Sequence, residues 1–235
     1  MQRRIDALVA DQRVWWGLGI VAVCAFAAGV SWWGYQRYVL AHNQRAQWAL
    51  SQQLEKFESV LQTETEDRAV WRDLEQGFEK AFELHRTSSI APFFRAYQAE
   101  AAFRAGDPVH AYELLTLALD AMGKNFPLYY PYAVKRAVWL LGMPEETLIE
   151  TLQGAPLHEV GIQQLKVLAQ DQKNPDPGLA WYHLWQYGLV HNNKDLTSMA
   201  AAKLQGIAHW EYVLHDSADQ GFDETLNVEM EETAA

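Results

Sequence analysis

The chain has little cysteine and, beyond its first 45 residues, little basic charge. Its 235 residues include one cysteine, Cys24, so neither a disulfide within one chain nor a CxxC metal or redox site can form. Residues 1–45 hold five arginines against two aspartates, a balance of +3, and the net charge of −11 therefore leaves −14 on residues 46–235. This acidic body excludes nucleic acid as a partner, because binding a phosphate backbone needs clustered Lys and Arg.

Strand patterns are also absent. From Arg45 onward Val and Ile do not cluster, and no long stretch alternates β-branched with polar residues. Apolar residues instead recur at intervals of three and four over segments of about 10–18 residues. Breaks separate these segments at 87–89, 106–108, 123–127, 142–144, 154–156, 174–178 and 191–193. We therefore predict an all-α fold: an N-terminal transmembrane helix followed by a solenoid of antiparallel helix pairs.

The sequence lacks the motifs of catalysis and cofactor binding. No GxSxG turn is present, and Gly123-Lys124 lacks both the earlier glycine and the hydroxyl of a phosphate-binding loop. His158-Glu159 begins like a zinc-protease motif, but Ile162 stands where the second histidine belongs. The eight histidines are dispersed along the chain. We expect no enzyme activity, no cofactor and no metal site.

The transmembrane helix is predicted from one long uncharged run, Val14 to Tyr35. Its 22 residues span about 33 Å as a helix, against about 30 Å for the hydrocarbon core of a bilayer. Tryptophan pairs about 25 Å apart mark both ends, where indole rings settle at the membrane surface. They are Trp15, Trp16, Trp32 and Trp33. We assign residues 14–36 to the span.

Three other interpretations of this run remain open. Ala25-Phe26-Ala27 matches the small-x-small site of a cleaved signal peptide, Cys24 could be acylated as in a lipoprotein, and the run could be a buried core helix. The run continues to a second tryptophan pair, which favours an uncleaved anchor. Residues 1–13 are expected to stay in the cytoplasm, so that the C-terminal domain is periplasmic.

A small-xxx-small pair lies inside the predicted span. It consists of Ala25 and Gly29. Small residues at this spacing let two helices approach closely in lipid. The pair therefore predicts a helix–helix contact within the membrane, although small residues are also common in spans that make no such contact.

A connecting helix is predicted over residues 37–66. Its apolar residues recur at four, three and four: Leu50, Leu54, Phe57 and Leu61. This stripe could pack on the body or on a partner helix, and packing within the chain is favoured. The helical domain that follows is predicted to span residues 67–213.

Three helix pairs are predicted within this domain, at residues 93–123, 130–154 and 178–206. In the first pair Gly106-Asp107 forms the turn, and alanines on the second helix permit close antiparallel packing. That packing face consists of Ala111, Leu115, Ala118 and Met122. In the third pair one helix is expected to contact the other through Ala180, His183, Leu184, Tyr187 and Gly188 on one side, and Met199, Ala200 and Leu204 on the other.

The stretch from Ala99 to Pro127 resembles a tetratricopeptide repeat, with Ala99 and Ala102 at its small helix-one positions and Gly106-Asp107 at its turn. Such repeats stack as helix pairs with a period near 34 residues. The whole layout resembles a family of bacterial single-pass tetratricopeptide-like membrane proteins that accompany the Sec translocon. The resemblance implies a non-catalytic subunit in the inner membrane that docks a periplasmic chaperone or a client polypeptide. A structural accessory subunit of another membrane complex is the alternative.

Two features are candidates for binding a partner. An aromatic set could line a peptide groove in the helical array or fill its core: Tyr129, Tyr132, Trp139, Trp181 and Trp185. Residues 214–235 are predicted to form an acidic, flexible tail, because Asp216 to Ala235 holds seven acidic residues and no Lys or Arg. This tail is either solvated or attracts a basic partner surface electrostatically. The predicted partners are the lipid bilayer, a membrane protein complex and a polypeptide.

Overall fold

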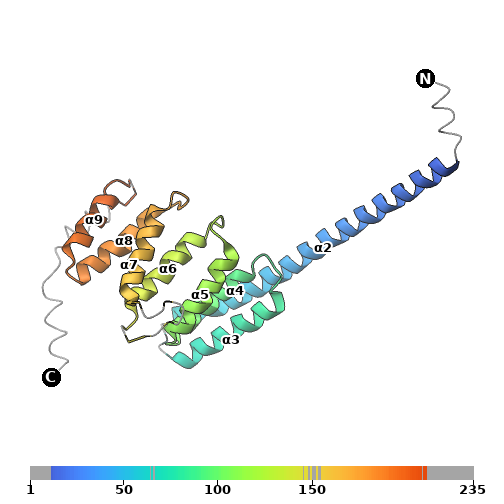
Figure 1. The fold of residues 1–235 in the computed structure, drawn as a ribbon. Coiled ribbons are helices and arrows are strands. Elements are labelled where there is room, and N and C mark those ends of the chain that lie inside the picture. Colours follow the sequence, from blue (N-terminus) through green and yellow to red (C-terminus); the bar gives the residue numbers. More distant parts are fainter. Residues whose placement is uncertain are drawn as a thin grey trace, which may run out of the picture.

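The computed structural model describes residues 12–63, 65, 67–144, 146–147, 149, 152, 155–207 and 209–210, with side chains from Val23 onward. Over these residues the chain is all-α, with eight helices and no strand (Figure 1), as predicted. The helices are α2 (Gln12–Gln62), α3 (Arg68–His85), α4 (Ala91–Arg104), α5 (Pro108–Met122), α6 (Tyr129–Gly142), α7 (Leu157–Gln170), α8 (Pro177–Val190) and α9 (Lys194–Leu204).

The longest helix, α2, runs without a break from the predicted membrane segment into the body. Its 51 residues extend about 76 Å. The N-terminal part projects away from the other helices, and the C-terminal part packs against α3 (Figure 1). The predicted connecting helix over residues 37–66 is therefore the second half of α2, which ends at Gln62.

The C-terminal part of α2 packs through the predicted stripe. The Phe57 ring is buried, and its centroid lies 5.6 Å from that of Trp71 on α3 and 5.6 Å from that of Tyr97 on α4. Such aromatic pairs contribute about 0.5–1.5 kcal/mol each beyond the burial of their area. The rest of the stripe is partly buried against the same core: Leu50, Leu54 and Leu61. The expectation that this stripe packs within the chain is confirmed.

The helices α4 and α5 form the first predicted pair. The Asp107 carboxylate caps α5 by accepting a hydrogen bond from the His110 N–H at 3.1 Å, and Pro108 starts the helix with its fixed φ. Gly106 has a φ of +87° in the turn, a conformation that favours glycine. Three residues of the predicted packing face of α5 are fully buried, Ala111, Leu115 and Ala118, and the fourth, Met122, is partly buried against the same core.

The next helix, α6, pairs with α7, so the predicted second pair is wrong. The spacing places the partner of α6 within residues 144–154, yet the described residues of that stretch form no α-helix. Gly161 on α7 accounts for the observed pairing. A Cβ atom there would lie 2.8 Å from Leu141 Cδ2 and 2.9 Å from the Ala137 carbonyl oxygen. Glycine therefore lets α7 approach α6 more closely than any other residue would.

The helices α8 and α9 form the predicted third pair. The Asn193 side-chain oxygen caps α9 by accepting from the Leu196 N–H at 3.1 Å. Gly188 brings α8 close to α9, since a Cβ atom there would lie 2.9 Å from the Thr197 nitrogen. Other predicted contact residues are buried in the core of this pair: Ala180, Leu184, Ala200 and Leu204.

Two residues predicted to join this contact do not. Met199 is 36 % exposed on α9. His183 borders a hollow between α6 and α8, together with Leu141.

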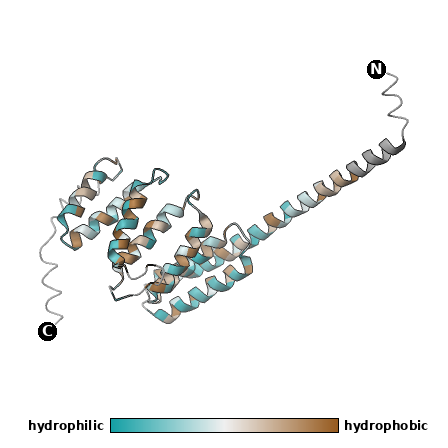
Figure 2. Ribbon diagram, in the orientation of Figure 1, coloured by the Kyte–Doolittle hydropathy of each residue, from teal (hydrophilic) through white to brown (hydrophobic). Residues whose placement is uncertain are grey.

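The helix pairs follow one another as an array (Figure 1). Because α7 packs against α8 as well as α6, the second and third pairs share one core. Figure 2 shows apolar residues both between the packed helices and on the projecting part of α2. Among the residues that the structure describes, no helix is both long enough and apolar enough to cross a membrane. Residues 1–11 and the predicted tail over 214–235 lie outside the described part.

Candidate interaction surface

An open hollow lies between the C-terminal end of α3, the first turns of α4 and the last turns of α5. Its volume is about 490 Å³. Apolar side chains form most of its wall, and Leu117 of α5 remains 56 % exposed there. A single exposed leucine needs no explanation, but one that borders a concave apolar wall is typical of a binding surface. We call this the α3–α5 hollow; its main residues are Phe82, Arg86, Pro92, Arg95, Leu117 and Ala121.

Two arginines give the α3–α5 hollow a basic rim. The Arg95 guanidinium stacks over the Phe82 ring, 4.0 Å from its centroid, and donates a hydrogen bond to Gln98 Oε1 at 3.1 Å. Its distance to the Glu83 carboxylate, 3.9 Å, makes only a weak ion pair. The Arg86 side chain forms no ion pair or hydrogen bond with any other described residue. The rim therefore carries positive charge that its surroundings do not neutralise.

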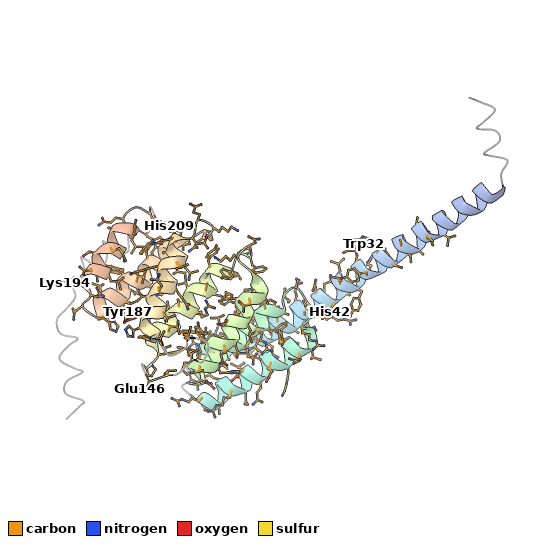
Figure 3. All side chains as sticks on the ribbon, viewed as in Figure 1. Trp32, His42, Glu146, Tyr187, Lys194 and His209 are labelled. Atoms are coloured by element: carbon orange, nitrogen blue, oxygen red, sulfur yellow. The ribbon has the colours of Figure 1, made fainter. Side chains whose placement is uncertain are left out.

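The turn from α3 to α4, which borders this hollow, is hydrogen-bonded to α2. Ser88 donates its hydroxyl hydrogen to Asn43 Oδ1 at 2.8 Å, and the Ser89 N–H donates to the same oxygen at 3.2 Å. The Thr87 hydroxyl lies 3.1 Å from His42 Nε2. These bonds hold the hollow beside the point where α2 leaves the body, at the labelled His42 in Figure 3.

Two histidines face each other at the same point. The ring centroids of His42 and His85 lie 5.7 Å apart, and the His85 ring stacks on Phe94 with centroids 6.0 Å apart. His85 Nδ1 is buried without a hydrogen-bond partner in the described part of the chain. Burial, with a second contribution from His42, lowers the pKa of His85. The junction between α2 and α3 is therefore most stable with a neutral His85.

The projecting part of α2 is a second exposed apolar surface. All of its described side chains from Val23 to Tyr38 are exposed, Phe26 by 75 %. Trp32 and Trp33 are among them, and Figure 3 shows Trp32 far from the packed helices. The other predicted interface residues, Trp15 and Trp16, lie outside the described side chains.

The small-residue pair of α2 also has no neighbour within the described chain. Ala25 is exposed, and a Cβ atom built at Gly29 would meet nothing within 4 Å. A close helix contact at this pair would need a second molecule.

The five aromatic residues predicted to line a peptide groove do not gather on one surface. Trp139 is 7 % exposed, and its ring stacks on Phe103 with centroids 4.6 Å apart. Trp181 is buried in the core that α8 and α9 share with α6 and α7. Buried rings cannot line a groove, so for these two residues the alternative, core filling, describes the structure.

The other three aromatic residues are partly buried at the edges of the two cores. Burial, with a second contribution from Tyr97, raises the pKa of Tyr132 far above its usual range. Tyr129 borders a smaller hollow of about 200 Å³ between α6 and α7. Trp185 packs beside Tyr182, with ring centroids 6.0 Å apart. The set belongs to two different cores, and it forms no single groove.

One further hollow, of about 390 Å³, lies between α6 and α8. Val138 and Val190 provide apolar edges, and His183 lines it with a pKa that burial lowers. No group of three or more His, Cys, Asp or Glu is arranged for metal binding within the described ranges. The α3–α5 hollow is larger and has the unneutralised arginine, so it is the stronger candidate for a partner.

One residue of the sequence, Leu117, indicates the α3–α5 hollow, although helical periodicity alone does not single it out. Leu117 falls outside the face formed by Ala111, Leu115 and Ala118, although it lies in the same helix. An apolar residue off the packing face indicates a surface that a partner could cover. In the structure this residue borders the same hollow as the unpaired Arg86.

No family model matches the chain, and no curated protein and no solved structure matches it.

Proposed function

We propose that this chain is a non-catalytic interaction protein, anchored in the inner membrane through residues 14–36, that docks a chaperone or client polypeptide at a membrane complex such as the translocon. The observation that carries the proposal is the arrangement of α2. One unbroken helix exposes apolar and aromatic side chains where it projects, and it packs into the body where it ends. Exposed apolar area of this extent is typical of a segment that contacts lipid or protein.

The anchor is supported by the uncharged run from Val14 to Tyr35, which begins before the first described side chain, Val23. Arg37 follows the run, and its guanidinium carbon lies 5.2 Å from the Trp33 ring centroid. An indole with a neighbouring cation at the end of an apolar helix is typical of the boundary between membrane and water. In this arrangement the N-terminus is cytoplasmic and the helical body is periplasmic.

Docking of a polypeptide is supported by the α3–α5 hollow. Stacked helix pairs provide concave surfaces that bind extended or helical segments. Here Phe82 and Leu117 offer an apolar wall for side chains, and Arg86 offers hydrogen-bond donors for carbonyl or carboxylate oxygens. The hydrogen bonds to Asn43 place this surface next to the proposed anchor.

A structural accessory subunit is the second candidate, and the outer face of α2 favours it. Trp48 is 67 % exposed and lies opposite Ala46 and Phe57, which are buried against the body. Leu40 is exposed on the same part of the helix, beyond the proposed span. A permanent partner would cover this face.

Anchoring is tested by alkaline extraction of membranes from cells that express the full chain. Phe26 lies near the middle of the proposed span, where an arginine costs about 2.5–3.5 kcal/mol. We expect Phe26→Arg to move most of the protein into the supernatant. The control Gln52→Arg, on the exposed outer part of α2, should leave the protein in the pellet. Release of the unaltered chain into the supernatant would contradict anchoring.

Photo-crosslinking separates the two candidate functions. A photo-reactive amino acid at Leu117 samples the α3–α5 hollow, and one at Trp48 samples the outer face of α2. An adaptor should form adducts with diverse polypeptides at position 117, and excess unfolded peptide should suppress them. An accessory subunit should instead form one constant adduct at position 48. If neither position forms an adduct with another protein in intact membranes, both candidates are wrong.

A further inference from the structure

The α3–α5 hollow and the C-terminal acidic segment complement each other in charge and in apolar content. We propose that the chain's own residues Asp216 to Ala235 occupy this hollow and thereby compete with any polypeptide that docks there. The hollow is part of the described body, whereas the segment follows Trp210, the last described residue.

Charge and the apolar wall together favour this hollow over the remaining surface. Residues 46–210 carry 14 Lys and Arg against 20 Asp and Glu, a balance of −6, so most of the body repels an acidic segment. Some cations elsewhere are paired, as Lys124 is with Asp171 at 3.0 Å and Lys135 with Glu100 at 2.6 Å, while others, such as Lys80 and Lys194, form no ion pair in the described part of the chain and line none of the three hollows. Arg86 is unpaired among the described residues, and Arg95 has only the weak contact with Glu83. Two adjacent arginines on an apolar hollow can each bind a carboxylate.

The apolar residues of the segment suit the wall of the hollow. Phe222, Leu226 and Met230 are spaced by four, so a helix would bring them to one face, together with Asp219, while Glu224 and Glu231 would lie on the opposite face. Binding of such a face in an apolar groove is a common mode of peptide recognition. The exposed Leu117 and the Phe82 ring would be its contacts in the hollow.

The connection is long enough for this contact. Trp210 is held against α8: its indole N–H donates to Asp176 Oδ1 at 2.9 Å, and its ring packs on Gly178. From there 12 residues lead to Phe222, the first apolar residue of the segment, and they reach at most about 40–43 Å when extended. Packed helices lie about 8–10 Å apart, so the three steps from α8 through α7 and α6 to α5 add up to about 24–30 Å, which the connection can span. A tethered segment meets its site at an effective concentration in the millimolar range, so weak contacts suffice.

The consequence for docking rests on the proposed function. A client would have to displace the acidic segment, so its apparent affinity for the hollow would fall in proportion to the fraction of chains in which the hollow is open. Because part of the contact is between exposed charges, salt would weaken the segment's hold.

The contact is tested with the purified full chain in mild detergent, carrying a photo-reactive amino acid at Leu117. We expect crosslinks within one chain to peptides from residues 216–235, identified by mass spectrometry. Arg86→Glu should lower their yield at least fivefold, and a second change, Glu231→Lys with Glu232→Lys, should restore part of it. Lys80→Glu, the same charge change at an exposed position of α3, should leave the yield unaltered.

Mixing isotopically labelled and unlabelled chains distinguishes contacts within one chain from contacts between chains. Crosslinks only to a second copy, to lipid or to residues outside 216–235 would overturn the inference. Ending the chain after Trp210 should increase the affinity for a fluorescent unfolded peptide at least fivefold. If neither the full chain nor the truncated chain binds the peptide, while the full chain still forms the crosslink to residues 216–235, the contact of the segment stands and the proposed docking function fails.

Discussion

The Ser88 hydroxyl and the Asn43 side chain are joined by a hydrogen bond of 2.8 Å across 45 residues of sequence. This bond ties the α3–α4 turn, and with it the α3–α5 hollow, to the helix that projects from the body. Asn43 also accepts from the Ser89 N–H, so one amide oxygen satisfies two donors of the turn.

We expect Asn43→Ala to lower the free energy of unfolding by about 1–3 kcal/mol, because the Ser88 side chain is buried and would lose its partner. Urea denaturation followed by circular dichroism measures the change. Gln44→Ala, at the adjacent exposed position, is the control and should stay within about 0.5 kcal/mol of the unaltered chain. Equal effects of the two substitutions would show that the Ser88–Asn43 bond contributes nothing to stability.

Gly188→Ala should destabilise the α8–α9 pair by about 1–3 kcal/mol, because the new methyl group would lie 2.9 Å from the Thr197 nitrogen, which belongs to the backbone and cannot move aside alone. Gly142→Ala is the matched control within the same array. A Cβ atom there meets nothing within 4 Å, so that change should stabilise the chain by about 0.4–1 kcal/mol. Thermal unfolding of both variants measures the difference, and a lower melting temperature for Gly142→Ala would contradict the open space assigned to it.

The helix pairs differ in how far the sequence alone predicts them. The α4–α5 and α8–α9 pairs follow from apolar spacing and from turn residues such as Asp107, whose physical effect is local. The partner of α6 does not follow from these signals. Gly161 permits the close approach of α7 to α6, but a glycine inside a helical pattern is read as destabilising the helix until its neighbour is known. Periodicity therefore predicted the two pairs whose helices are joined by a short turn. The pair of α6 with α7, whose connection is longer, is recognised only from the close approach between the two helices.

Acidification should lower the stability of the α2–α3 junction. The pKa of His85 is lowered in the folded chain from its ordinary value of 6.5, so the folded state holds the neutral ring while the unfolded state takes up a proton. The contribution is complete above about pH 6.5 and is lost as the pH falls below that value toward the folded pKa. Thermal unfolding between about pH 8 and pH 5 measures the slope. His85→Gln should have a shallower slope than the unaltered chain, and an identical slope would exclude His85 as its source.

The candidate site was less readable from sequence than the fold, because burial decides whether an aromatic residue is core or surface. Trp139 and Trp48 both lie in helical segments rich in apolar residues. Their exposed fractions, 7 % and 67 %, depend on which face the neighbouring helices cover. Aromatic content alone therefore left groove lining and core filling open for Trp139, and it gave no sign of the exposed Leu117.

Truncation of these two tryptophans tests the distinction directly. Trp139→Ala removes a ring that stacks on Phe103 at 4.6 Å and is almost fully buried, so we expect a loss of about 3–5 kcal/mol in the free energy of unfolding. Trp48→Ala removes an exposed ring of the same size and should change that free energy by less than about 0.5 kcal/mol. Urea denaturation of the two variants side by side measures both values. Near-equal losses would mean that Trp48 is covered in the folded chain. An unaltered stability of Trp139→Ala would mean that Trp139 is not a core residue and could line a groove.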